Sequence, residues 1–138
     1  MKKILFVCVE NAGRSQMAEA FFKKYLPSGF QPTSAGTKPA AKVNPIVVQA
    51  MKEVGIDIEC NSPQSISQQI IEETEIAVNM GCMDKESCPA LFLKNVQDWQ
   101  ISDPKGKSIE QVRIIRDQIE QKVKDLIVSV TKGDSIGL

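Results

Sequence analysis

Hydrophobic and polar residues follow two kinds of spacing along this chain, one typical of strands and one of helices. Largely apolar stretches bounded by turn-forming residues predict four strands, at 3–7, 30–34, 76–80 and 98–101. Apolar residues that recur at helical spacing predict helices at 16–25, 45–54, 66–73 and 109–130. Strands that alternate with helices, without internal repeats, predict an α/β fold: a single doubly wound, four-stranded parallel sheet flanked by helices.

Two of the helices also carry start signals that do not depend on hydrophobic spacing. Asn44 is a typical cap residue and Pro45 suits the first helical position. The stretch from Ser108 to Gln111 is a capping box that opens the longest helix. The polar segment that follows this helix predicts a frayed tail at 131–138, so the single domain is expected to span residues 1–130.

Composition narrows the classes of partner. Lys and Arg together number 17, as do Asp and Glu, so nucleic acid is not an expected partner. No apolar run approaches about 18 residues and no cleavable leader is apparent, so we expect a soluble cytoplasmic protein without a membrane partner. The chain has four cysteines and no histidine. Cysteines in such a protein are more often catalytic or metal-binding than part of a disulfide framework.

The turn between the first strand and the first helix has the composition of an anion site. Cys8 lies where the strand ends and Arg14 where the helix begins. The free N–H groups of a helix N-terminus attract anions, and the same field favours a nucleophilic thiolate at Cys8. Arg14 has the geometry to grip an oxyanion through two hydrogen bonds, and Ser15 to donate to the sulfur. The expected oxyanion-binding residues are Val9, Glu10, Asn11, Ala12, Gly13, Arg14 and Ser15.

Two further reactive side chains follow predicted strands. Ligands of doubly wound sheets bind beyond the carboxyl ends of the strands, so Cys8, Cys82 and Asp103 are expected at one edge of the sheet. Asp103 is a candidate general acid in a chain without histidine, although Asp before Pro also simply starts turns. Cys82 and Cys88 suit thiol–disulfide exchange with Cys8; zinc binding and plain burial are the alternatives.

The stretch from Cys8 to Glu19 resembles the phosphate-binding loop of the low-molecular-weight tyrosine phosphatase superfamily. Within this stretch, the sequence Asn-Ala-Gly-Arg-Ser-Gln-Met-Ala-Glu is most similar to the arsenate reductase branch. The resemblance covers nearly the whole chain, including residues 44–58, the pair Cys82 and Cys88, and residues 103–107. In these features the chain looks like the arsenate reductases that are coupled to thioredoxin.

This resemblance implies an order of events. Arsenate binds in the loop, Cys8 attacks arsenic and Asp103 protonates the departing oxygen. Cys82 then displaces arsenite and leaves a Cys8–Cys82 disulfide, which Cys88 resolves to Cys82–Cys88 for reduction by thioredoxin. The family implies no cofactor, and we expect a monomer whose loop also accepts phosphate or sulfate. Cys60 has no role in this scheme and is interpreted as structural.

Two features depart from the family pattern. Glu10 adds negative charge to the anion-binding turn, so its side chain is expected to point outward. Some family members hold potassium beside the loop, and four residues here are compatible with it: Asn11, Glu19, Ser34 and Ser62. Gln64 stands where that resemblance implies an acid, which argues against the ion.

Two other functions remain open from the sequence. A low-molecular-weight tyrosine phosphatase would use Cys8, Arg14 and Asp103, but it would have no use for Cys82 and Cys88. A non-catalytic oxyanion or redox sensor would use the same cysteines to switch a partner.

Overall fold

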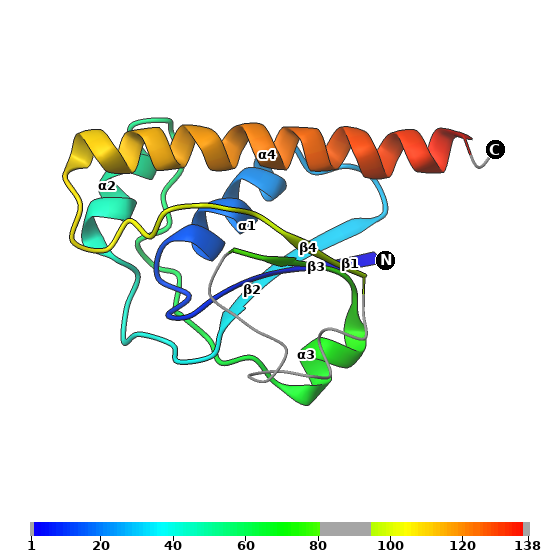
Figure 1. The fold of residues 1–138 in the computed structure, drawn as a ribbon, viewed down its shortest axis with the longest axis horizontal. Coiled ribbons are helices and arrows are strands. Elements are labelled where there is room, and N and C mark those ends of the chain that lie inside the picture. Colours follow the sequence, from blue (N-terminus) through cyan, green and yellow to red (C-terminus); the bar gives the residue numbers. More distant parts are fainter. Residues whose placement is uncertain (1, 81–94, 137–138) are drawn as a thin grey trace.

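The computed structural model describes residues 2–80 and 95–136 of the chain. Its elements are β1 (Lys2–Cys8), α1 (Arg14–Lys24), β2 (Phe30–Gly36), α2 (Pro45–Lys52), α3 (Gln68–Glu73), β3 (Thr74–Asn79), β4 (Asn95–Asp98) and α4 (Ile109–Ile136). The strands form one sheet in the order β2-β1-β3-β4, and every neighbouring pair is parallel. The predicted fold class is confirmed (Figure 1).

Helices cover both faces of the sheet. Figure 1 shows α1, α2 and α4 on one side and α3 on the other. Successive side chains of a strand point to opposite faces, so Ile4 and Phe6 of β1 pack into the larger core with α1, α2 and α4. Leu5 and Val7 pack instead into the smaller core, which includes Ile71 of α3. Because β1 is buried on both faces, it reads in the sequence as an unbroken apolar run.

Local start signals act as the sequence predicts. The Asn44 side chain accepts the amide N–H of Ile46 at 3.1 Å and caps α2. In the capping box of α4, Ser108 Oγ accepts the amide N–H of Gln111 at 3.3 Å, and Gln111 Oε1 accepts that of Ser108 at 3.2 Å. These contacts fix where the helices begin, independently of the core.

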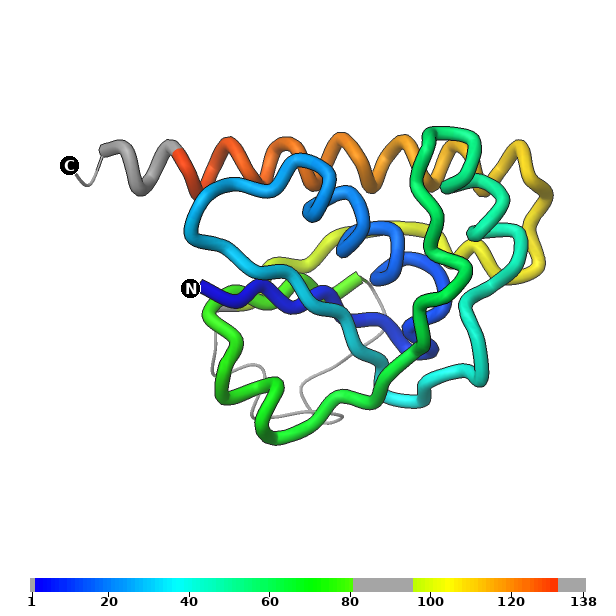
Figure 2. The backbone as a smooth tube through the Cα atoms, turned by 180° about the vertical axis from the view of Figure 1, so that it is seen from behind, coloured from blue at the N-terminus to red at the C-terminus, as the bar shows by residue number. Residues whose placement is uncertain are grey.

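Two predicted boundaries were wrong. The fourth strand covers Asn95–Asp98 rather than 98–101, because the apolar residues Trp99 and Ile101 are buried in an extended segment that lies outside the ladder. Only the amide of Trp99 still bonds to the sheet, through the carbonyl oxygen of Asn79 at 2.9 Å. The last helix continues to Ile136, beyond the end of its apolar spacing and through most of the predicted tail (Figure 1). Figure 2 shows the preceding turns of this helix from behind.

The carboxyl ends of the strands meet at one edge. The register pairs Cys8 with Gly36 and Val7 with Asn79, and Asn79 in turn with Asp98. A Cβ atom on Gly36 would lie 2.5 Å from the carbonyl oxygen of Val9, so only glycine lets the loop after β1 approach β2 this closely. The sheet thereby presents the loop that begins at Cys8.

Candidate active site

The thiol of Cys8 is buried and hydrogen-bonded within its own loop. Cys8 Sγ and Ser15 Oγ are 2.8 Å apart, and Asn11 Nδ2 donates to the same Ser15 Oγ at 2.8 Å. Since the hydroxyl oxygen accepts from Asn11, its one proton is free to point at the sulfur. Ser15 is therefore arranged as a donor to the sulfur of Cys8.

Asn11 is held in a conformation that few residues adopt. It is fully buried, and its φ of 52° is the only positive φ of a non-glycine residue in the described chain. Gln16 Nε2 donates to its carbonyl oxygen at 3.0 Å and to Oδ1 at 3.2 Å, and the amide N–H of Gln64 also reaches Oδ1, at 2.9 Å. With Oδ1 committed to these donors, the Nδ2 group of Asn11 faces Ser15.

The guanidinium of Arg14 is locked beneath the loop. Its Nη1 donates to the carbonyl oxygens of Met80 and Ile101, both at 2.9 Å. Both Nη1 hydrogens are thereby used, so Nε and Nη2 are the groups left to bind an oxyanion. The residue is 8% exposed, and the two carbonyls that hold it follow β3 and β4. Arg14 thus ties the loop to the ends of two other strands.

The N-terminus of α1 has no side-chain cap. The cap position is Gly13, from which no side chain can bond to the first N–H groups of the helix. These groups carry the positive end of the helix dipole, and they face the hollow of the loop. An anion in the loop satisfies them.

A cavity of about 210 Å³ opens at this point. It is lined by Cys8, Val9, Glu10, Ala12, Gly13, Arg14, Asn44, Asp103, Pro104 and Lys105. Asp103 Oδ1 accepts the amide N–H of Lys105 at 3.0 Å, and its Oδ2 lies 3.7 Å from Arg14 Nη2. The structure therefore brings the predicted nucleophile and the predicted acid to one cavity, although they are far apart in the chain.

Glu10 has a cationic partner that the sequence did not reveal. We expected its side chain to point outward; it is partly exposed, and its Oε1 accepts a hydrogen bond from Lys105 Nζ at 2.7 Å, at the mouth of the cavity. This bond raises the pKa of Lys105 above its ordinary value, so the ammonium stays charged. Lys105 is a site residue that the sequence reasoning missed.

Gln16 and Asn61 were missed as well. Gln16 is 2% exposed and belongs to the recognised motif, but its contact with Asn11 depends on the fold of the loop. Asn61 Nδ2 in turn donates to Gln16 Oε1 at 3.2 Å. Nothing in the spacing of these amides signals the contact, since Asn61 lies 45 residues further along the chain.

The oxygens suggested for potassium already have protein partners. Gln64 Nε2 donates to the carbonyl oxygen of Ser34 at 2.7 Å, and Ser34 Oγ donates to Glu19 Oε1 at 2.8 Å. The other oxygen of Glu19 is paired with Lys23 at 3.0 Å. At three of the four candidate residues, Asn11, Glu19 and Ser34, the oxygens therefore already accept hydrogen bonds from N–H, O–H or ammonium groups, which does not fit a potassium ion.

Cys82 and Cys88, which we expected to take part in the disulfide relay, lie outside the described residues. What is described is the chain just before them: Met80 follows β3, and its carbonyl oxygen accepts a hydrogen bond from Arg14. Cys60 is exposed on the connection between α2 and α3. Among residues 2–80 and 95–136, no three His, Cys, Asp or Glu side chains are grouped to hold a metal, and no helix is long and apolar enough to cross a membrane.

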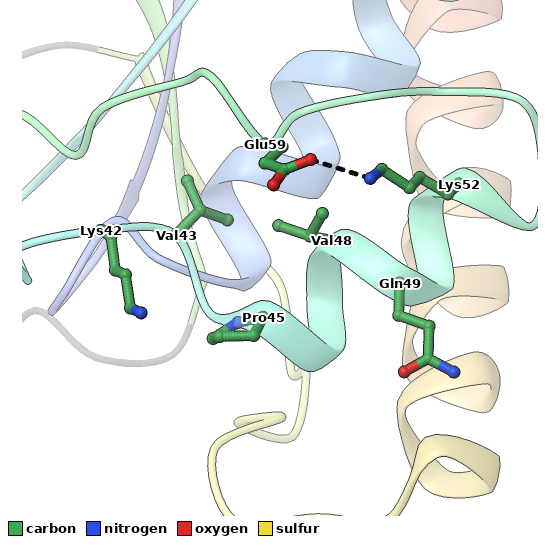
Figure 3. Close-up of a pocket in the computed structure, with 7 residues that line it drawn as sticks. All are labelled: Lys42, Val43, Pro45, Val48, Gln49, Lys52 and Glu59. Carbon is green, nitrogen blue, oxygen red and sulfur yellow. Dashed lines mark hydrogen bonds and ion pairs between the residues drawn. The ribbon is translucent and has the colours of Figure 1, made fainter.

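A second cavity, of about 450 Å³, lies against α2 (Figure 3). It is lined by Lys42, Val43, Pro45, Val48, Gln49, Lys52 and Glu59. Lys52 and Glu59 pair across it at 2.8 Å, and none of these side chains is a thiol or hydroxyl. The smaller cavity at Cys8 is therefore the one equipped for nucleophilic chemistry.

The comparisons with known proteins agree with this geometry. The family model of the low molecular weight phosphotyrosine protein phosphatases matches residues 3–135. The chain belongs to this family. Within the family it is 41% identical to a protein of Halobacterium salinarum named putative arsenate reductase, over 96% of this chain and 95% of that one. It is 33% identical to the glutaredoxin arsenate reductase of Synechocystis sp., over 95% of this chain and all of that one.

Solved structures of the phosphatase family resemble the whole chain. An arsenate reductase in its phosphate-binding state has a TM-score of 0.83 and 34% identity, covering 94% of this chain and 98% of that one. An arginine phosphatase from Geobacillus stearothermophilus has a TM-score of 0.87 and 26% identity, covering 96% and 95%. A thioredoxin-dependent arsenate reductase of Corynebacterium glutamicum has a TM-score of 0.80 and 30% identity, covering 96% of this chain and 63% of that one.

Proposed function

We propose that this protein is an arsenate reductase, which converts arsenate to arsenite. The observation that carries the proposal is the arrangement around Cys8: a sulfur that receives the Ser15 hydroxyl, above an arginine with two N–H positions left for an oxyanion. The names of its relatives in the family, at up to 41% identity over nearly the whole chain, support the choice of substrate.

The first step is nucleophilic. The thiolate of Cys8 attacks arsenic, an S–As bond forms, and one arsenate oxygen leaves as water after Asp103 gives it a proton. Arg14 and the N–H groups of the loop hold the remaining oxygens and offset their charge. Arsenic is still As(V) in this adduct.

The second step transfers the electrons. We propose that the thiolate of Cys82 attacks the sulfur of Cys8, so that the S–As bond breaks and its electron pair stays with arsenic. Arsenic leaves as arsenite, As(III), and the two sulfurs are oxidised to a Cys8–Cys82 disulfide. Cys88 then attacks Cys82, which regenerates the thiol of Cys8 and leaves a Cys82–Cys88 disulfide.

Thioredoxin is the proposed reductant of that final disulfide. An intramolecular Cys82–Cys88 bond is the kind of substrate that a dithiol protein reduces, without a separate small thiol. One structural neighbour is titled thioredoxin-dependent and one relative is named for glutaredoxin, so the assay compares both.

Disulfide mapping tests the relay. Reduced protein is mixed with one equivalent of arsenate, digested and mapped by mass spectrometry while released arsenite is measured. We expect arsenite and a Cys82–Cys88 bond; the C88S variant should stop at Cys8–Cys82 after one turnover. Cys60→Ser is the matched control and should give the wild-type map. Unchanged thiols, or a disulfide to Cys60, would contradict the relay.

A phosphatase activity of the same site is the second candidate. Cys8, Arg14 and Asp103 line one cavity, and one structural neighbour with the same fold is titled an arginine phosphatase. Among the described residues that line the cavity there is no aromatic side chain, which disfavours a phenyl phosphate. Hydrolysis of para-nitrophenyl phosphate that is fast, and unaffected by C82S and C88S, would favour this alternative.

A further inference from the structure

Glu10 is an unusual residue for the place it occupies. It lies in the loop whose N–H groups and Arg14 are arranged for an anion, and it lines the same cavity. A carboxylate there repels an incoming oxyanion, because like charges at close range repel one another. The loop therefore needs something that offsets this charge.

Lys105 is placed to offset it. It comes from the loop after β4, 95 residues further along the chain, and its ammonium lies 2.7 Å from Glu10 Oε1. Both side chains are partly exposed, at 68% for Lys105 and 39% for Glu10, so the pair lies at the mouth of the cavity and not beneath it. The anion meets this pair before it meets Cys8.

The same residue also connects the two halves of the cavity. Its backbone N–H binds Asp103 Oδ1 at 3.0 Å, while its side chain binds Glu10 of the opposite loop. Between these contacts, Pro104 packs on Gly13 so closely that a Cβ there would lie 2.8 Å from Pro104 Cγ. The loop that carries Asp103 is thereby held against the loop that carries Cys8.

We propose that Lys105 is a determinant of oxyanion affinity in this enzyme, because it cancels the charge of Glu10 at the mouth of the oxyanion cavity. The two residues act as one unit, and oxyanion affinity follows their summed charge. The wild-type pair is neutral, loss of Lys105 leaves one negative charge, and loss of Glu10 leaves one positive charge. The inference rests on the proposed function only in that the cavity binds a tetrahedral oxyanion.

Calorimetric titration with inorganic phosphate tests the proposal without any redox step. Lys105→Met should weaken phosphate binding about ten-fold at low ionic strength, on the scale of one unpaired charge near a dianion. Glu10→Gln should tighten binding by several-fold, because Lys105 is then unpaired. The double variant E10Q/K105M is neutral again and should return to within about two-fold of the wild type.

Two controls make the outcome specific. Lys107→Met removes a lysine from the same loop that does not line the cavity, and phosphate binding should not change. The effects of both single variants should shrink at 0.5 M salt, where the Debye length is only a few ångströms. Thermal unfolding of each variant shows that the protein is folded.

Either of two results would overturn the proposal. If the double variant binds phosphate as weakly as K105M, Lys105 acts through its own charge on the anion and not through Glu10. If K105M binds like the wild type, the pair has no influence at all. Neither result would change the disulfide map, so the proposed function would stand. If instead the disulfide map fails while the phosphate titrations behave as expected, only the proposed function is overturned.

Discussion

The buried amide of Gln16 is predicted to control both the stability of the loop and the orientation of its nucleophile. Replacement of Gln16 by methionine keeps the length and volume of the side chain but removes the donor to the Asn11 carbonyl oxygen and Oδ1. That carbonyl belongs to a fully buried residue at a φ of 52°, so water cannot easily replace the lost donor.

The size of the effect follows from these contacts. A buried polar group left without its partner costs about 1–3 kcal/mol, and that is the expected loss in the free energy of unfolding. Without Gln16, only the Gln64 N–H still binds Asn11 Oδ1, so the Nδ2 group is held less firmly towards Ser15 and the Ser15 proton is directed less well to Cys8. Misplacement on this scale lowers kcat/KM by up to about 100-fold.

Two assays separate the parts of this prediction. Urea denaturation gives the loss of stability, and the rate at which iodoacetamide alkylates Cys8 reports the reactivity of its sulfur, which should fall several-fold. Asn61→Ala is the matched control, because it removes only the outer bond of 3.2 Å to Gln16 and costs less than about 1 kcal/mol. Wild-type alkylation in a Gln16→Met protein that is destabilised would refute the link between Gln16 and the sulfur.

Three further outcomes are expected. Gly36→Ala should abolish phosphate binding, measured by calorimetry, because its Cβ would lie 2.5 Å from the Val9 carbonyl oxygen and displace the loop. Glu53→Gln should lower the thermal midpoint strongly at pH 7 and much less at pH 2. Hydrogen bonds from Arg113, then Arg116, lower the pKa of Glu53 from 4.5 to about 2. The stabilisation from these bonds is therefore present above pH 4.5 and is lost as the pH falls through 2. Arsenate reduction should proceed equally fast in potassium chloride and tetramethylammonium chloride of the same ionic strength, since protein donors already bind the oxygens of the candidate cation site.

Much of the fold was predictable because its signals are local. The unbroken run of β1, the cap at Asn44 and the box at Ser108 each depend on a few neighbouring residues. The position of the site followed from topology, since parallel strands place Cys8 and Asp103 at one edge. The shifted β4 shows the limit of this reasoning: burial of Trp99 gives the same apolar signal whether or not the residue joins the ladder.

The contacts that position the site could not be predicted in the same way. The Glu10–Lys105 pair joins two loops that are 95 residues apart, and neither residue has a neighbour in sequence that indicates the other. Likewise, the contact from Gln16 to Asn11 requires the left-handed turn that only the folded loop contains. Both contacts depend on where side chains point after the chain has folded, and the spacing of residues in the sequence does not encode that.

Because α1 begins without a side-chain cap, the thermal stability of the purified protein should depend on whether its buffer contains an oxyanion. Because no side chain bonds the first N–H groups after Gly13, a bound oxyanion completes the helix, and binding and folding draw on the same contacts. Phosphate at one hundred times its dissociation constant would add about 2.7 kcal/mol to the free energy of unfolding. Melting curves recorded in phosphate and in an amine buffer would then describe two different ligation states of one protein.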